Sequence, residues 1–203
     1  MRVALFDYGA GNLHSLKKAL EAGGSRVLVT TSWDEALGEE ALVLPGVGSF
    51  GAAVQALSGQ QERVRDALLN GLPTLGICLG MQLLFSRSQE AEGEGIGLIP
   101  GEVRILRSRT IPQMGWNEVM ASEDRIFTGV APLVAYFANS YVCEPRDSST
   151  IISATEYQGD GFPSGVRLGR TWGLQFHPEK SSRAGLRIIH NFLEAVREEG
   201  ERP

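Results

Sequence analysis

Cysteine is scarce in this sequence of 203 residues, which has only Cys78 and Cys143. Two cysteines do not make a disulfide framework. An excess of positive charge is also missing, since the formal net charge is −5 at pH 7. Binding of nucleic acid needs a basic face for the phosphates, so we do not expect nucleic acid as the main partner.

Long apolar runs are absent as well. No stretch approaches the roughly 20 residues that span a bilayer, so we expect no membrane partner. The first apolar run, "VALF" at residues 3–6, is too short for a secretory signal. We therefore expect a cytoplasmic protein whose cysteines are reduced.

Histidine is also scarce, with three copies, and no cluster of metal-ligating residues is visible. We expect no metal and no other cofactor. Apolar residues are plentiful, because 42% of the chain is hydrophobic and 21% is charged. This composition is typical of a soluble globular protein with a sizeable core. With no linker or repeat in view, we predict one domain over residues 1–203.

The first half of the chain alternates between short apolar runs and helical patterns. Strands are predicted at "RVALFD", "RVLVT", "ALVLPG" and "TLGIC". Helices are predicted at "LHSLKKALEAGG", at "GAAVQAL" with "QERVRDALLNG", and from "LGMQLLF" onward. Wholly apolar strands between helices indicate a parallel sheet covered on both faces. The second half reads as strands joined by short turns, including one run at "LVAYFANSYV", and a final amphipathic helix.

"GICLG", residues 76–80, has the glycine–x–nucleophile–x–glycine form of a nucleophile elbow. An elbow places the nucleophile on a tight turn between a strand and a helix. The helix N-terminus favours a thiolate at Cys78, and the N–H of Leu79 would face a developing oxyanion. A buried core cysteine is the alternative at this position. Cys143 has no such surroundings and is predicted to be a packing residue.

"GLQFHPEK" offers a base for this thiol. Pro178 favours an extended conformation at His177, so the strand should end there. Residues two apart in an extended chain point the same way, which would place Glu179 beside the imidazole. Nucleophile, base and orienting carboxylate form a catalytic triad. The alternative is a His-Pro turn with a solvated glutamate.

"LPGVGSFGAA", residues 44–53, contains a G-x-G-x-x-G pattern. The pattern follows the third predicted strand, whereas a dinucleotide fingerprint belongs to the first strand–helix turn. We therefore favour a loop that faces the elbow, with the N–H groups of Val47 and Gly48 as candidates for a second oxyanion donor. A plain tight turn remains the alternative.

At this point the chain resembles the class I glutamine amidotransferases. "GICLGMQLLF" resembles their nucleophile motif and "GLQFHPEKS" their His-x-Glu motif, in the same chain order. Within the family, "DYGAGNLHSLKKAL", "LPGVGSFGAA" and "IPQMGWN" resemble the glutaminase subunits of imidazole glycerol phosphate synthase, from histidine biosynthesis. The resemblance covers essentially the whole chain. It implies a flavodoxin-like α/β fold with a mixed central sheet and helices on both faces.

The resemblance also implies the chemistry. Cys78 would attack the side-chain amide of L-glutamine, His177 would transfer protons, and Glu179 would orient His177. Oxyanion donors would come from Val47, Gly48 and Leu79, and glutamine would be held by Gly48, Gln82, Ser140 and Tyr141. "FANSY" departs from the family at Ala138-Asn139, where relatives often have Val-His. This departure bears on contacts from that strand and leaves the triad intact.

Relatives pass ammonia to a cyclase subunit, a (β/α)₈ barrel that makes imidazole glycerol phosphate and AICAR, so the resemblance implies a heterodimer. Segments that meet the partner in relatives contain Asn12, Trp116, Asn117, Tyr136 and Lys180. We predict that "MGWN" is a surface loop and that the chain alone is a weak glutaminase. Three other functions stay open: a sister glutaminase that supplies pyridoxal phosphate synthesis or another acceptor, a thiol hydrolase acting alone, and a binding module with an inert thiol.

Overall fold

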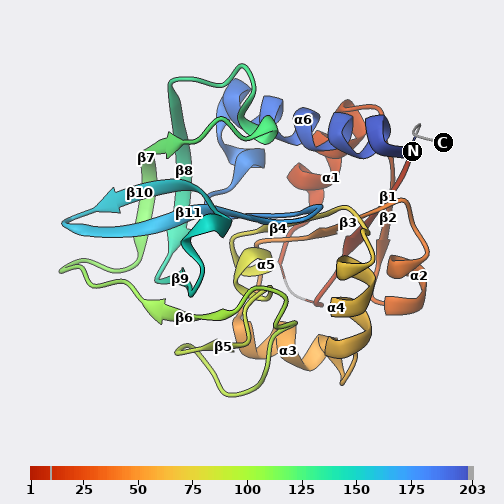
Figure 1. Cartoon of the computed structure of the whole chain (residues 1–203), viewed down its shortest axis with the longest axis horizontal. Helices are drawn as coiled ribbons and strands as arrows, with labels where there is room; N and C mark the ends of the chain where they lie inside the picture. Colours follow the sequence, from red (N-terminus) through yellow and green to blue (C-terminus); the bar gives the residue numbers. More distant parts are fainter. Residues whose placement is uncertain (10, 201–203) are drawn as a thin grey trace.

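A computed structural model describes residues 1–9 and 11–200, with the side chains of 199 and 200 left aside. The predicted domain over 1–203 therefore includes residues 10 and 201–203, which lie outside the described part. A nine-stranded mixed sheet runs through the molecule in the order β2-β1-β3-β4-β12-β11-β10-β7-β8 (Figure 1). A second sheet has the order β5-β6-β9.

In the described part of the first half, helices separate the four strands, and both α3 and α4 lie between β3 and β4. Its strands are β1 (Arg2–Phe6), β2 (Arg26–Thr30), β3 (Ala41–Leu44) and β4 (Thr74–Ile77). Its helices are α1 (His14–Ala22), α2 (Trp33–Leu37), α3 (Phe50–Leu57), α4 (Gln61–Leu69) and α5 (Leu79–Gln82).

The second half contains the remaining strands and the last helix. Its strands are β5 (Arg87–Ser88), β6 (Gly101–Ile105), β7 (Gln113–Ala121), β8 (Leu133–Asn139), β9 (Tyr141–Pro145), β10 (Ile151–Tyr157), β11 (Asp160–Leu168) and β12 (Thr171–Leu174). Its helices are α6 (Ser182–Gly200) and the 3₁₀ turns η1 (Arg125–Phe127), η2 (Ser148–Thr150) and η3 (Pro178–Lys180).

The predicted parallel sheet covered on both faces is confirmed. β2, β1, β3, β4 and β12 pair in parallel. Val3 and Leu5 face one core with α1 and α6, whereas Ala4 and Phe6 face the other with α2, α3 and α4. This alternation is what wholly apolar strands imply, because neighbouring residues point to opposite faces. The strand order β2-β1-β3-β4-β12 agrees with the flavodoxin-like prediction.

Two predicted elements were wrong in extent. The helix expected through "LGMQLLF" ends at Gln82, because the carbonyls of Leu83 and Leu84 accept hydrogen bonds from the amides of Ile96 (2.7 Å) and Ile99 (3.0 Å) instead. The run "LVAYFANSYV" divides at Ser140, with β8 in the nine-stranded sheet and β9 in the small sheet. The alternation of buried residues breaks at this division, since Ser140 and Tyr141 are both half-buried and Val142 and Cys143 are both buried. The sequence shows only apolar residues on both sides of Asn139 and Ser140, so it was interpreted as one run.

The predicted surface loop at "MGWN" was also wrong, since these residues lie in β7 and pair with β8. Trp116 is nevertheless 54% exposed, because β7 and β8 leave one face uncovered. The glycine and the polar neighbours led to the loop prediction, although strand residues with one solvated face are commonly polar.

An ion pair joins the two sheets. Arg104 of β6 donates to both carboxylate oxygens of Asp160 at the start of β11, at 2.7 and 2.9 Å, and its Nε donates to Glu144 at 2.7 Å. Both side chains of the Arg104–Asp160 pair are over nine-tenths buried. A buried charge requires such full pairing, so the pair fixes the small sheet against the large one.

Candidate active site

Cys78 lies at the turn between β4 and α5, as the elbow motif predicts. Its backbone has φ 48° and ψ −103°, a conformation that L-residues rarely adopt and that costs of the order of 1–3 kcal/mol. Two backbone hydrogen bonds hold this turn: Cys78 N–H donates to the Leu174 carbonyl at 2.6 Å, and Gln82 N–H donates to the Cys78 carbonyl at 3.1 Å. The thiol is therefore presented at the N-terminus of α5 by a strained backbone.

The two glycines of the motif are required by close backbone packing. A Cβ at Gly80 would lie 2.0 Å from the carbonyl oxygen of Leu44, at the end of β3. A Cβ at Gly76 would lie 2.6 Å from the carbonyl oxygen of Gly80 itself. Both distances are far below van der Waals contact, so neither position accepts a side chain without moving backbone.

His177 follows β12 and is nearly fully buried, with 2% of its surface exposed. The backbone N–H of His177 donates to the Tyr136 carbonyl at 2.9 Å, and this hydrogen bond holds the residue against β8. Nδ1 lies 2.9 Å from Glu179 Oε1. The predicted contact is therefore present, but its predicted geometry was wrong: only His177 is extended, and Glu179 reaches the imidazole from the 3₁₀ turn η3.

The environment of His177 raises its pKa from 6.5 to about 9. Burial alone would lower this pKa, because it disfavours the charged imidazolium. Hydrogen bonds with Cys78 and Glu179, together with the negative charges of these two groups, outweigh burial. Since Nδ1 faces Glu179, Nε2 is left to face the sulfur, and the imidazole is held in a protonated state at neutral pH.

The glycine-rich loop after β3 closes over this pair. A Cβ at Gly46 would lie 2.8 Å from His177 Cε1 and 2.9 Å from Cys78 Cβ. Gly48 has φ 100°, in the region that favours glycine. The side chain of Val47 turns away to Gly11, where an added Cβ would lie 2.5 Å from Val47 Cβ. The oxyanion role of the Val47 and Gly48 amides stays a prediction.

A cavity of about 190 Å³ opens beside the thiol. It brings together most of the residues predicted to contact substrate or oxyanion. Its lining consists of Gly46, Gly48, Cys78, Leu79, Gln82, Glu90, Ala138, Asn139, Ser140 and Tyr141. β8 and β9 meet at this point, so the division at Ser140 places residues of both sheets in one wall.

Two polar residues of the site were missed in the sequence. Glu90 lines the cavity, with Oε1 accepting from Phe50 N–H at 3.2 Å. It comes from the acidic segment "QEAEGEG", and nothing in that segment distinguishes it from its neighbours. Gln175 is fully buried, and its Nε2 lies 3.5 Å from Cys78 Sγ. Its signal was available, because it stands two residues before His177 at the end of a strand.

The predicted partner residues fall into two groups. Trp116 and Tyr136 are paired across β7 and β8 with ring centroids 6.1 Å apart, and Lys180 Nζ lies 5.9 Å from the Tyr136 ring. Asn117 donates to the Glu156 carbonyl at 2.8 Å, and Asn12 lies on the exposed turn before α1. The structure therefore clusters Trp116, Tyr136 and Lys180, while the two asparagines make hydrogen bonds within the chain.

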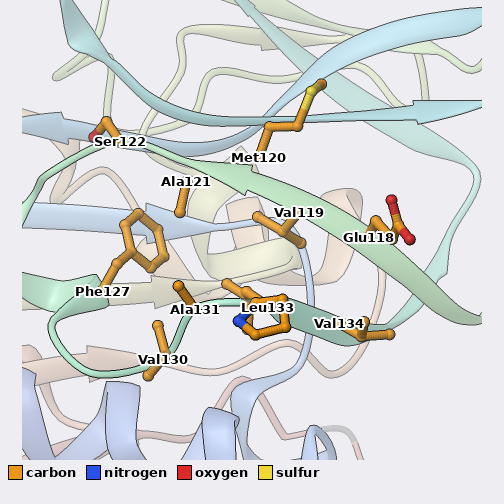
Figure 2. Close-up of a pocket in the computed structure, with 11 residues that line it drawn as sticks. Glu118, Val119, Met120, Ala121, Ser122, Phe127, Val130, Ala131, Leu133 and Val134 are labelled. Atoms are coloured by element: carbon orange, nitrogen blue, oxygen red, sulfur yellow. The ribbon is translucent and has the colours of Figure 1, made fainter.

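A larger cavity of about 300 Å³ lies between β7 and the segment that ends in β8 (Figure 2). Phe127, Val119, Leu133 and Val130 supply much of its wall. It contains neither a thiol nor a histidine, so its size does not make it the candidate for catalysis. Cys143, predicted to be a packing residue, is fully buried in the core.

Across residues 1–9 and 11–200, no helix is long and apolar enough to cross a membrane. The same part of the chain contains no group of three or more His, Cys, Asp or Glu residues arranged to hold a metal ion.

Comparison with solved structures supports the fold. A crystal structure described as a glutamine amidotransferase aligns with a TM-score of 0.76 at 20% identity, covering 96% of this chain and 98% of that one. The structure of PurLQS from Thermotoga maritima aligns with the same TM-score at 19% identity and the same coverage. At such low identity these likenesses concern the fold alone.

Comparison of sequences decides the family. Residues 4–196 match the family described as glutamine amidotransferase class-I. The chain belongs to the class-I glutamine amidotransferases. Among curated members, imidazole glycerol phosphate synthase subunit HisH of Methanothermobacter thermautotrophicus is 41% identical over 96% of this chain and 99% of its own length. The same-named subunit of Symbiobacterium thermophilum is 44% identical over 94% of this amidotransferase and 92% of its own length.

Proposed function

We propose that this amidotransferase is the glutaminase subunit of an imidazole glycerol phosphate synthase in histidine biosynthesis. The names of its relatives support this assignment. It would hydrolyse L-glutamine to glutamate and ammonia and pass the ammonia to a cyclase subunit that makes imidazole glycerol phosphate and AICAR. The observation that carries the proposal is the strained turn that presents Cys78 to the hydrogen-bonded His177–Glu179 pair. We further propose that the chain is one domain and acts in the cytoplasm.

The first half of the proposed reaction forms a thioester. The proton of the Cys78 thiol is held by His177, and the sulfur attacks the side-chain amide carbon of glutamine as a thiolate. The oxygen of that amide becomes negative and is stabilised by the N–H of Leu79 and an N–H of the Val47–Gly48 loop. His177 then donates its proton to the departing nitrogen, and ammonia leaves. The raised pKa of His177, about 9, keeps this proton available at neutral pH.

The second half regenerates the thiol. His177 removes a proton from water as the water oxygen attacks the thioester carbon, and the same donors stabilise the second oxyanion. When this intermediate collapses, the carbon–sulfur bond breaks, glutamate is released and the sulfur recovers a proton from His177. Glu179 keeps Nδ1 hydrogen-bonded throughout, so Nε2 alone faces the reacting atoms.

The cavity beside Cys78 fits an amino acid. Glu90 presents a carboxylate to it, and the α-ammonium group of glutamine is a suitable partner for that charge. Gln82, Ser140 and Tyr141 also line the cavity and supply neutral polar groups, and we propose that these residues hold the rest of the substrate. Glu90 is thus a substrate-binding residue in addition to those predicted.

An uncovered apolar face on β7 and β8 is the proposed docking face for the cyclase, a (β/α)₈ barrel. Four of its side chains are well exposed: Met114 (66%), Trp116 (54%), Met120 (66%) and Val134 (42%). Tyr136 and Lys180 adjoin Trp116, and His177 is hydrogen-bonded to the backbone of the same Tyr136. Clusters of exposed apolar side chains mark interaction sites. Docking there would keep ammonia from bulk water, where it is mostly protonated.

The test is ammonia release from glutamine, measured for the purified chain alone, with a cyclase subunit, and with cyclase plus its ligand. We expect a stable complex, weak activity alone and a rise of at least about tenfold in the complete mixture. Cys78→Ala should abolish activity in every mixture and still bind the cyclase. Activity that persists in Cys78→Ala would refute the triad, whereas lack of complex formation and of stimulation would refute only the subunit assignment.

A further inference from the structure

A buried glutamine lies within hydrogen-bond distance of the nucleophilic sulfur. Gln175 follows β12 and has no exposed surface. Its backbone N–H donates to the Ser164 carbonyl at 2.9 Å, which fixes the residue against β11. Its side-chain Nε2 lies 3.5 Å from Cys78 Sγ, a normal distance for a hydrogen bond from nitrogen to sulfur. The triad chemistry described above makes no use of this contact.

The orientation of the Gln175 amide follows from its neighbours. The Tyr141 carbonyl can only accept a hydrogen bond, so the group of Gln82 that lies 3.2 Å from it must be Nε2. This nitrogen is also 3.4 Å from the amide oxygen of Gln175. The oxygen of Gln175 therefore faces Gln82, and its nitrogen faces the sulfur. Because an amide nitrogen only donates, the sulfur is the acceptor.

We propose that Gln175 is a further catalytic residue of the proposed glutaminase reaction. Its amide donates a hydrogen bond to the Cys78 sulfur and stabilises the thiolate, both as nucleophile in the first step and as leaving group when the thioester is hydrolysed. The inference rests on the proposed function, because a thiolate matters only if Cys78 is the nucleophile. A hydrogen bond to a charged acceptor favours the charged form, and burial of the amide strengthens it.

Several titratable groups also surround the sulfur. His177 faces it with Glu179 behind, Glu90 and Tyr141 line the same cavity, and Cys143 is near enough for the charge of Cys78 to add to the burial that raises the pKa of Cys143. The Ala138 carbonyl, 4.0 Å away, can accept only from the protonated thiol. The amide of Gln175 carries no charge, so replacing it changes thiolate stability and leaves the charges of the site in place.

A purely structural role is the competing explanation. Gln175 would then serve only to fill the core and to hold Gln82 through its oxygen. Loss of such a role would change the stability of the protein or its affinity for substrate. The pH dependence of the alkylation of Cys78 would stay unchanged. The pH dependence of thiol alkylation therefore separates the two explanations.

The experiment compares the wild-type protein with Gln175→Met, which has similar length and no N–H donor. Thr171→Val is the control, since Thr171 is a fully buried residue of β12 whose hydroxyl has no hydrogen-bond partner in the described structure. Alkylation of Cys78 by iodoacetamide is measured from pH 5 to 10, and the labelled peptide is identified by mass. Each protein is first checked for cooperative thermal unfolding.

Loss of the donor should move the alkylation midpoint upward by about one pH unit in Gln175→Met. Thiolate nucleophilicity rises as the thiolate becomes more basic, with a Brønsted coefficient of about 0.4–0.5. The variant should therefore react about threefold more slowly than wild type at pH values below both midpoints and about threefold faster above both, so that the two curves cross. Thr171→Val should follow the wild-type curve.

A wild-type midpoint in folded Gln175→Met would overturn the inference. If that variant does not fold, the wild-type protein labelled with ¹⁵N-glutamine provides the second measurement. The Gln175 side-chain amide resonance should then titrate with the alkylation midpoint, and an invariant resonance would overturn the inference. Persistent glutaminase activity in Cys78→Ala would instead refute the proposed function, so the two failures are distinguishable.

Discussion

Glu179 makes unequal use of its two carboxylate oxygens. Oε1 lies 2.9 Å from His177 Nδ1, whereas Oε2 is buried without a hydrogen-bond partner in the described structure. A buried carboxylate in this position contributes mainly its charge and its orientation of the imidazole. Both contributions favour the protonated form of His177, whose pKa is raised to about 9.

Replacing Glu179 with Gln keeps the shape of the side chain and removes the charge. We expect kcat/KM for glutamine to fall by about a hundredfold or more, since the orienting carboxylate of a triad has effects of this order or larger. The pKa of His177 should move from about 9 toward 6.5, so the alkaline limb of the activity profile should shift to lower pH. Steady-state kinetics between pH 6 and 10 measure both changes.

The same substitution has a signature in stability. The pKa of His177 is higher in the folded state (about 9) than its ordinary value of 6.5, so proton binding stabilises the fold fully below pH 6.5. This stabilisation is lost as pH rises through about 9. Glu179→Gln should therefore lower Tm more at pH 6 than at pH 9.5. An equal decrease at both pH values would contradict the proposed coupling between Glu179 and His177.

Glu90 is the other carboxylate with a proposed role in the site. Glu90→Gln keeps an oxygen for the Phe50 N–H and removes the charge offered to the substrate ammonium group. We expect KM for glutamine to rise by about tenfold or more with kcat within about threefold, because the lost contact is equally present in ground and transition states. Glu92→Gln, two residues away and exposed, is the matched control. Equal KM values in the two variants would remove Glu90 from the substrate site.

At the scale of elements, the turn between β4 and α5 depends on close approach of three backbone segments. Gly80→Ala should destabilise the protein by about 3 kcal/mol or more, because a Cβ would lie 2.0 Å from the Leu44 carbonyl oxygen and only backbone movement relieves the clash. Gly161→Ala is the control, since a Cβ at Gly161 meets no atom within 4 Å and its φ is ordinary. Denaturant unfolding of both variants measures the difference in stability. Similar unfolding midpoints would show that β3 can move away from residue 80 at little cost in free energy.

The elements that sequence predicted well are those with a strong local signal. The first-half strands are mostly apolar and separated by helical patterns, so β1 to β4 were predicted within one or two residues. Elements fixed by tertiary contacts were missed or misjudged. α2 has only five residues. α5 ends at Gln82 because the next two carbonyls, of Leu83 and Leu84, accept hydrogen bonds from amides more than ten residues away. β7 is a strand because β8 and β10 pair with it.

The site shows the same division. Cys78 and His177 were predictable because a strained turn and a strand end each require a particular local sequence. Glu90 and Gln175 reach the sulfur or its cavity through the fold of distant segments. Glu90 lies on a loop whose position no local pattern fixes. Gln175 had a local signal in its place two residues before His177, but its contact with the sulfur depends on the fold.

At the scale of the whole molecule, the docking face lies on β7 and β8, away from α4 at the other side of the molecule (Figure 1). Met114→Lys should weaken the complex with the cyclase by at least about tenfold, because it places a charge among apolar interface residues. Leu69→Lys on α4 is the matched control, since Leu69 is 62% exposed and Met114 is 66% exposed. Sedimentation or calorimetry with the cyclase measures the affinities. Equal weakening by the two substitutions, or none by Met114→Lys, would place the partner elsewhere.

The continuity of β8 and β9 through Ser140 has a consequence for how this chain can vary in length. Residues of β8 alternate between a buried face, with Phe137, and the docking face, with Tyr136. Deleting or inserting one residue before Ser140 would exchange these faces and displace the cavity wall in the same event. Evolutionary insertions should therefore be excluded from residues 133–145 and accumulate in exposed loop positions such as 92–94, which belong to no strand.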